Sequence, residues 1–123
     1  MNAAVGKSMV RSPLPVYVVD DDEDMRLLVG RWLEGDGYQA TSCTSASSFL
    51  DVVEEGSRGV VILDLRMPGL GGLEVMEQLQ NREHSLAVIV LTASNEAQDA
   101  FQAVKLGAYD YLVKPVSRQH LLA

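Results

Sequence analysis

Carboxylates gather directly after an apolar run near the start of the chain. Residues 16–24 read VYVVDDDED, so four apolar residues lead straight into Asp20, Asp21 and Asp22. Two carboxylates about 5 Å apart repel each other by roughly 3 kcal/mol at an effective dielectric constant of about 20, which weakens a fold unless a cation relieves the repulsion. Two interpretations are open at this point: a solvated acidic turn, which is the commoner origin of a charge run, and a metal site.

Three further polar residues also stand directly after apolar runs. Asp64 follows GVVIL, Thr92 follows AVIVL, and Lys114 follows YDYLV. Carboxylates, a backbone carbonyl and waters make the all-oxygen octahedron that Mg²⁺ prefers. A carboxylate can also accept a phosphoryl group, and a lysine ammonium and a threonine hydroxyl can bind the phosphoryl oxygens. These residue types are therefore suited to phosphoryl transfer, which depends mainly on positioning and charge neutralisation.

The elements that must position these residues alternate along the chain. Short β-rich segments are expected at 17–19, 38–43, 59–63, 87–91 and 109–113. Between them, apolar residues recur at helical spacing within 25–33, 46–53, 75–79 and 97–104. This alternation predicts a parallel sheet with helices on both faces. The continuous Val/Ile/Leu runs agree, because strands that are buried on both sides do not alternate in polarity.

The carboxyl ends of the predicted strands explain where the polar residues stand. In an open α/β sheet, ligands bind beyond the carboxyl ends of the strands, at the switch in strand order. The acidic run, Asp64, Thr92 and Lys114 all stand at strand ends and are therefore expected to converge on one rim. A solvated acidic turn does not account for Asp64 or Lys114, so the sequence favours a site.

Helix boundaries and core residues can be predicted from the same patterns. Asp22 is better suited to capping the first helix than to binding metal, and Gly107 is placed to end the helix at 97–104. Trp32 and Phe101 lie on apolar helical stripes and are expected in the core. The last helical pattern, at 117–123, is about half the usual length of a helix, so this helix is expected to be incomplete.

Length, composition and charge restrict the class of protein. The 123 residues suffice for one domain with its own core, and 47% are apolar and 22% charged. The net charge of −7 argues against direct nucleic-acid binding and suits a cation or a basic partner. The single cysteine, Cys43, cannot form an internal disulfide, which fits a reducing cytosol. No apolar run is long enough to span a bilayer, and residues 1–14 are expected to form a flexible tail, not a signal peptide.

Four motifs in order carry a resemblance to a known family. VVDDDEDMR, LDLRMPGLGG, VLTAS and YDYLVKP resemble the receiver domain of two-component response regulators, and together they span residues 16–115. The resemblance implies an α/β, doubly wound (βα)5 flavodoxin-like fold, with a parallel sheet in the strand order 2-1-3-4-5. It assigns residues 15–123 to the receiver domain, with the last helix truncated.

The resemblance also implies a role for the acidic residues at the rim. Asp64 is the expected phosphoacceptor, with Mg²⁺ as the cofactor. Asp21 is expected to bind the ion directly and Asp20 mostly through water, joined by Asp64 and the backbone carbonyl of Arg66. The position of Arg66 varies among such domains, so its long cationic side chain could shield or steer the phosphoryl group.

Residues around the acceptor are implied to bind the phosphoryl group or respond to it. Lys114 and Thr92 are expected to contact it, and Thr92 is also the expected switch hydroxyl. Tyr111 is the expected aromatic switch residue that turns inward, although the residues alone would also fit a plain core position. Pro115 is expected to be structural, with a cis bond to Lys114. The domain is thus expected to be a phosphoryl acceptor that assists its own phosphorylation and dephosphorylation, not an enzyme.

Partners and output follow from the same resemblance. A sensor histidine kinase is the implied donor, and a homodimer through the face of the fourth helix, fifth strand and fifth helix is a further candidate. Neither direct nucleic-acid contact nor a membrane is expected, and the expected location is the cytoplasm. SASSFL and the overall style are similar to those of the FixJ/NarL group of DNA-binding regulators. Phosphorylation is therefore expected to switch a surface that controls a transcription-regulating domain absent from this chain.

Three other site types fit the residues less well. A haloacid-dehalogenase-type phosphatase also starts with a strand and a DxD pair, here Asp20 and Asp22, but it wants Thr or Val where Asp24 stands and usually a longer chain. An EF-hand is excluded, because Met25 occupies its glycine position and Arg31 its bidentate glutamate position. A flavodoxin-like FMN binder needs a hydroxyl-rich loop where this chain has aspartates. Turnover of a small phosphate ester would separate the phosphatase from the receiver.

Overall fold

Five parallel strands form one sheet, and a helix follows each of the first four. The computed structural model describes residues 15–53, 56–67, 69, 71–82, 85–93, 97–115, 119 and 121. The elements are β1 (Pro15–Val19), α1 (Glu23–Gly35), β2 (Gln39–Cys43), α2 (Ala46–Val52), β3 (Arg58–Leu63), α3 (Gly72–Gln80), β4 (Ser85–Thr92), α4 (Ala97–Lys105) and β5 (Asp110–Val113). The strand order is β2-β1-β3-β4-β5 and every pairing is parallel, which confirms the predicted topology.

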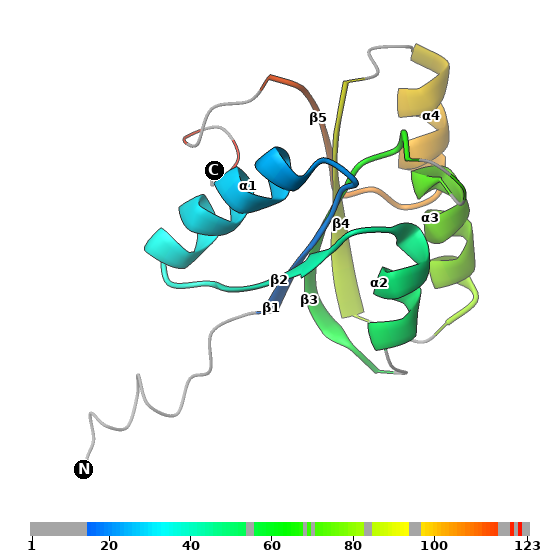
Figure 1. Cartoon of the computed structure of the whole chain (residues 1–123). Coiled ribbons are helices and arrows are strands. Elements are labelled where there is room, and N and C mark those ends of the chain that lie inside the picture. Colours follow the sequence, from blue (N-terminus) through cyan, green and yellow to red (C-terminus); the bar gives the residue numbers. More distant parts are fainter. Residues whose placement is uncertain are drawn as a thin grey trace.

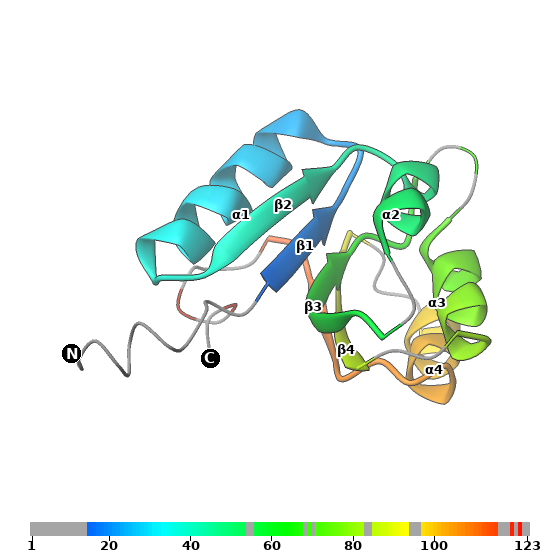
Figure 2. The same ribbon diagram turned by 90° about the horizontal axis from the view of Figure 1, so that it is seen from below.

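The four helices with described bounds are divided between the two faces of the sheet. α1 lies on one face, whereas α2, α3 and α4 lie together on the other (Figure 1, and from below in Figure 2). Each face has its own buried cluster, with Phe49 and Met76 on the side of α2 to α4 and Val29 and Leu33 on the side of α1. Because the sheet is buried on both sides, its central strands read as continuous apolar runs.

Side chains fix the starts of the first two helices. Asp22 is the N-cap of α1, as predicted, and its carboxylate accepts a hydrogen bond from the backbone N–H of Asp24 at 3.0 Å. Ser45 caps α2, and its hydroxyl accepts from the backbone N–H of Ser48 at 3.1 Å while the Ser48 hydroxyl accepts from the N–H of Ser45 at 3.2 Å. These caps satisfy backbone donors that a helix N-terminus leaves unpaired.

Phe101 is not a core residue, so that prediction is wrong. The side chains of Phe101 and Val104 are 61% and 64% exposed, whereas Ala103 is buried completely. The apolar residues of α4 fit two overlapping stripes, and the helix buries the one that contains the small Ala103, because a small residue allows the helix to approach the sheet closely. Trp32 is partly buried and packs against the cluster on the α1 side.

Two predictions concern the ends of the chain. The tail over 1–14 and most of the helix over 117–123 lie outside the described residues. Leu121 is described, and its side chain is buried in the cluster on the α1 side.

The peptide bond between Lys114 and Pro115 is cis, as expected. Within the described part of the chain, the helices are too short or too polar to cross a membrane.

Candidate functional site

The register of the sheet brings the ends of β1 and β3 side by side. Val19 of β1 lies opposite Leu63 of β3, so the residues that follow them, Asp20 and Asp64, leave the sheet at the same level. The backbone N–H of Asp64 donates to the carbonyl oxygen of Val19 at 3.0 Å. The predicted convergence of these two carboxylates on one rim is therefore confirmed.

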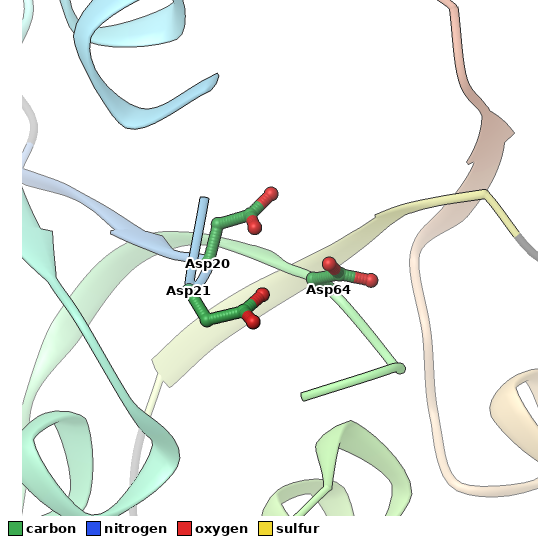
Figure 3. Close-up of side chains that lie close together, drawn as sticks. All are labelled: Asp20, Asp21 and Asp64. Atoms are coloured by element: carbon green, nitrogen blue, oxygen red, sulfur yellow. The ribbon is translucent and has the colours of Figure 1, made fainter. Parts of the chain in front are cut away.

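Asp20, Asp21 and Asp64 form a compact cluster of carboxylates. One carboxylate oxygen of each residue lies within 4.8 Å of those of the other two. Figure 3 shows the three side chains gathered where β1 and β3 end. Asp20 and Asp64 are only 4% and 6% exposed, whereas Asp21 is exposed. Like charges that are buried this close together repel strongly, so the cluster calls for a cation.

Lys114, the residue that follows β5 at the edge of the sheet, supplies one such cation. Thr92, at the end of β4, lies opposite Val113, and the backbone N–H of Lys114 donates to the Thr92 carbonyl at 2.8 Å. This places the Lys114 ammonium 3.0 Å from Asp20 Oδ2 and 3.4 Å from Asp64 Oδ2. Lys114 therefore bridges the two buried carboxylates.

Burial and charge shift the pKa values of both members of this ion pair. Burial raises the pKa of Asp20, and the charge of Asp64 adds to the rise, although the N–H of Asp22 and Lys114 act against it. Burial by itself would lower the pKa of Lys114, but the hydrogen bond to Asp20 and the charges of Asp64 and Asp20 outweigh it and raise that pKa. Lys114 is thus held in its charged form, while burial and the charge of Asp64 disfavour the charged form of Asp20.

The loop after β3 folds tightly around Asp64. The backbone N–H of Arg66 donates to Asp64 Oδ1 at 3.1 Å. Gly69 has φ +76°, a left-handed conformation that favours glycine. At Gly72, the first residue of α3, a Cβ would come within 2.5 Å of the Asp64 carbonyl oxygen and 2.7 Å of the Leu65 Cα. Only glycine lets α3 start this close to the loop.

Thr92 and Tyr111 lie on the same face of the sheet. Tyr111 pairs with Val90, two residues before Thr92, so the two side chains are one register step apart on that face. Thr92 is completely buried, and Tyr111 is partly buried against the cluster on the side of α2 to α4. The structure therefore brings the two predicted switch residues close together on the sheet face that carries α4.

Two residues that the sequence analysis did not single out contact the site. Nη1 of Arg26, in α1, donates to the backbone carbonyl of Asp20 at 2.7 Å. Asp99, in the first turn of α4, forms an ion pair with Arg66. Arg26 could have been identified from the sequence, because it lies within one helical turn of the acidic run. No local signal marks Asp99, because it lies 33 residues from its partner.

A hollow of about 290 Å³ opens beside the Arg66–Asp99 ion pair. Its lining comes from the loop after β3, α3 and α4, and consists of Leu65, Arg66, Met67, Gly69, Gly71, Leu73, Glu74 and Asp99. The Arg66 side chain therefore borders open space and is not packed into a core.

The donor set of the cluster fits a hard divalent cation. All three side chains offer carboxylate oxygens, which are the preferred ligands of Mg²⁺. Two of them are buried and, among the described side chains, share one lysine, so a divalent charge between them would relieve the remaining repulsion. Asp21 is exposed, which leaves room for the waters that Mg²⁺ usually retains. The residues present therefore suit Mg²⁺.

Comparison with known proteins agrees with this fold and site. The sequence profile of the response regulator receiver domain family matches residues 16–123. The chain is 42% identical over 110 residues to the transcriptional regulatory protein FixJ of Azorhizobium caulinodans, covering 89% of this chain and 52% of that protein. It is similar to the crystal structure of full-length FixJ from B. japonicum, with a TM-score of 0.82, 33% identity and coverage of 91% and 55% of the two chains. A CheY-like receiver domain protein from Methanospirillum hungatei shares the fold, with a TM-score of 0.81, 24% identity and coverage of 90% and 89%.

The class of protein follows from the fold, the rim of carboxylates and these matches. The chain belongs to the response regulator receiver domain family, and it is a receiver domain of a two-component response regulator. It spans about half the length of the FixJ proteins that it matches.

Proposed function

We propose that the carboxylate of Asp64 accepts a phosphoryl group from a sensor histidine kinase, with Mg²⁺ bound beside it. The position of Asp64 supports this best. It directly follows β3, the central strand of the sheet, with Asp20 and Asp21 close by and the Lys114 ammonium 3.4 Å from its Oδ2. Its longer contact with Lys114 leaves Asp64 less firmly held than Asp20, whose Oδ2 lies 3.0 Å from the same ammonium.

The transfer itself is a displacement at phosphorus. A carboxylate oxygen of Asp64 attacks the phosphoryl group on the kinase histidine, and a new O–P bond forms. The P–N bond breaks at the same time, and its electron pair returns to the imidazole. Lys114 neutralises one phosphoryl oxygen and the hydroxyl of Thr92 donates to another. Bound Mg²⁺ supplies further charge neutralisation and alignment.

The ligands proposed for the ion are Asp20, Asp21, Asp64 and the backbone carbonyl of Arg66. Asp21 is exposed, and we assign it to direct coordination. Both oxygens of Asp20 already have partners, because Oδ1 accepts the N–H of Asp22 at 3.0 Å and Oδ2 pairs with Lys114. Asp20 therefore acts mostly through water.

Phosphorylation and dephosphorylation of Asp64 use the same groups. Lys114, Thr92 and the metal ligands stabilise charge on the phosphoryl group whether Asp64 or water is the nucleophile. The domain thus assists its own phosphorylation and dephosphorylation without being an enzyme for a separate substrate.

The proposed output lies on α4 and β5. Phosphorylation draws Thr92 toward the phosphoryl group and lets Tyr111 turn inward, which changes the adjacent surface. Phe101, Val104, Tyr109 and Val113 are all exposed on this surface. Exposed apolar groups of this kind favour association, so a homodimer through this face is the proposed active form. By likeness to FixJ, the whole protein is proposed to regulate transcription in the cytoplasm.

Acetyl phosphate tests the proposal without the kinase. The protein should gain one phosphoryl group by intact mass when Mg²⁺ is present, and none after chelation. Asp64→Asn should abolish the adduct, whereas Asp51→Asn, which removes an exposed carboxylate on α2, should leave it unchanged. An adduct that persists in Asp64→Asn, or that resists hydroxylamine as a serine ester does, would refute the assignment.

A further inference from the structure

One residue touches both the phosphoacceptor and the output helix. The backbone N–H of Arg66 donates to Asp64 Oδ1 at 3.1 Å, while its guanidinium Nη2 pairs with Asp99 Oδ2 on α4. The ion pair spans 33 residues of sequence, so it connects two elements that the chain does not join directly. Arg66 is therefore placed to pass a change at Asp64 to α4.

The other cations near the acceptor point elsewhere. Lys114 bridges the carboxylates of Asp20 and Asp64, and Arg26 binds the backbone carbonyl of Asp20. Arg66 starts two residues from Asp64, yet its guanidinium pairs with Asp99, whose side chain is only 15% exposed. Among the described cations that contact the site, Arg66 is the one whose side chain is held on α4.

A phosphoryl group on Asp64 would compete with Asp99 for this guanidinium. It carries about two negative charges and three acceptor oxygens, and planar guanidinium groups bind such oxygens in a bidentate manner. Asp99 offers one charge. The Arg66 side chain is 59% exposed and borders the hollow described above, so it can change partner without disrupting packed residues.

We propose that Arg66 exchanges Asp99 for the phosphoryl group when Asp64 is phosphorylated, an inference that rests on the proposed function of Asp64. In the unphosphorylated protein the Arg66–Asp99 ion pair holds α4 in place and opposes phosphoryl binding. Its release frees the helix that carries Phe101, two residues beyond Asp99. Because coupling between two sites is reciprocal, a change at Asp99 that weakens the ion pair but leaves Arg66 in place must strengthen binding of the phosphoryl group.

The affinity for beryllofluoride, a non-covalent mimic of the phosphoryl group on aspartate, tests this in the presence of Mg²⁺. Titration calorimetry should show that Asp99→Asn binds about fivefold more tightly than the unchanged protein, within the usual range of coupling between sites. Asp99→Ala should behave in the same way if the first variant folds poorly. The matched control Asp51→Asn removes one exposed carboxylate on α2 and should leave the affinity unchanged.

The double variant Arg66→Ala/Asp99→Asn distinguishes an exchange of partners by Arg66 from the direct electrostatic effect of removing the Asp99 charge. Removing the charge of Asp99 could strengthen anion binding on its own. If Arg66 carries the effect, Asp99→Asn should have no effect on the affinity in a chain that already carries Arg66→Ala. A gain of the same size in that background overturns the proposal, as does an unchanged affinity in Asp99→Asn alone. If the unchanged protein itself does not bind beryllofluoride with Mg²⁺, the proposed function fails together with this inference.

Hydrogen exchange gives a readout without any ligand. Arg66→Ala leaves the sequence of α4 intact, so faster exchange of the α4 amides would show that the ion pair holds the helix. Arg31→Ala, an exposed arginine on α1, is the control and should leave α4 exchange unchanged. Equal exchange in Arg66→Ala and the unchanged protein would overturn the restraining role.

Discussion

At the level of single residues, the carboxylates of the site outnumber the lysine that neutralises them. Asp20 and Asp64 are buried, Asp21 is close to both, and only the ammonium of Lys114 bridges the two buried carboxylates among the described side chains. The raised pKa of Asp20 reflects burial first and the neighbouring charge of Asp64 in addition. The rim is therefore arranged to gain stability from a divalent cation.

Asp21→Asn should separate metal binding from folding. If Mg²⁺ binds with a dissociation constant of about 1 mM, 10 mM Mg²⁺ stabilises the unchanged protein by about 1.4 kcal/mol through mass action. The variant should lose most of this gain, because its amide is a weaker ligand. Without Mg²⁺ its melting temperature should be no lower, because one repelling charge is gone. A melting temperature of the unchanged protein that does not respond to Mg²⁺ would contradict the metal site.

Lys114→Met should lower the free energy of unfolding, because it leaves the buried carboxylates without their cation. Removing one partner of a buried ion pair leaves the other charge uncompensated, and because Lys114 is partly exposed we expect a loss of about 2 kcal/mol in the free energy of unfolding. Urea denaturation without Mg²⁺ measures this loss. Lys105→Met, on the exposed end of α4, is the control; its ammonium lies 5.6 Å from the centre of the Phe101 ring, so stability should change by less than about 1 kcal/mol. Equal effects of the two variants would show that Lys114 does not stabilise the cluster.

At the scale of elements, the strand ends and the helix starts position the rim. β1 and β3 place Asp20 and Asp64 side by side through their register, and α3 closes the loop after Asp64 because Gly72 lacks a side chain. The geometry around Asp64, the proposed phosphoacceptor, thus depends on a contact between α3 and its backbone.

Gly72→Ala should disturb the acceptor loop through this contact. The new Cβ would lie 2.5 Å from the Asp64 carbonyl oxygen, so α3 or the loop must shift, at a cost of about 1–3 kcal/mol. Phosphorylation by acetyl phosphate should slow as well. Gly30→Ala makes the same chemical change inside α1, where a Cβ would meet nothing within 4 Å, and should stabilise the protein slightly. If both variants are equally stable and equally fast, the close approach of α3 is unimportant.

The elements also show what the sequence could and could not predict. Asp20, Asp64, Thr92 and Lys114 follow apolar runs, so their meeting on one rim was predictable from strand alternation alone. The buried face of α4 was not, because Phe101 and Ala103 lie on overlapping apolar stripes and only packing against the sheet selects Ala103. The ion pair of α4 with Arg66 could not be predicted either, since its partners are distant in sequence and Asp99 looks like an ordinary surface charge.

At the scale of the whole molecule, the site and the proposed output surface are joined through the β4–β5 side of the sheet. Thr92 and Tyr111 share a face of these strands, and α4 beside them exposes Phe101 and Val104. A change at Asp64 can therefore reach the surface that is proposed to form the dimer.

Phe101→Ser should prevent the proposed dimer while leaving the fold intact, because the side chain is 61% exposed. With Mg²⁺ and beryllofluoride, sedimentation velocity should show a dimer for the unchanged protein and a monomer for this variant. Leu27→Ser removes an apolar side chain that is 52% exposed on α1, away from this surface, and should still dimerise. A dimer that survives Phe101→Ser, or one that Leu27→Ser disrupts instead, would place the interface elsewhere.

Borohydride reduction identifies the phosphorylated carboxylate on which the proposed function rests. After treatment with acetyl phosphate and Mg²⁺, borohydride converts an aspartyl phosphate to homoserine, which peptide mass spectrometry locates. We predict homoserine at position 64 and unmodified aspartate at positions 20 and 21. Homoserine at position 20 or 21, or at none of the three in protein that carries the phosphoryl group, would show that Asp64 is not the phosphoacceptor.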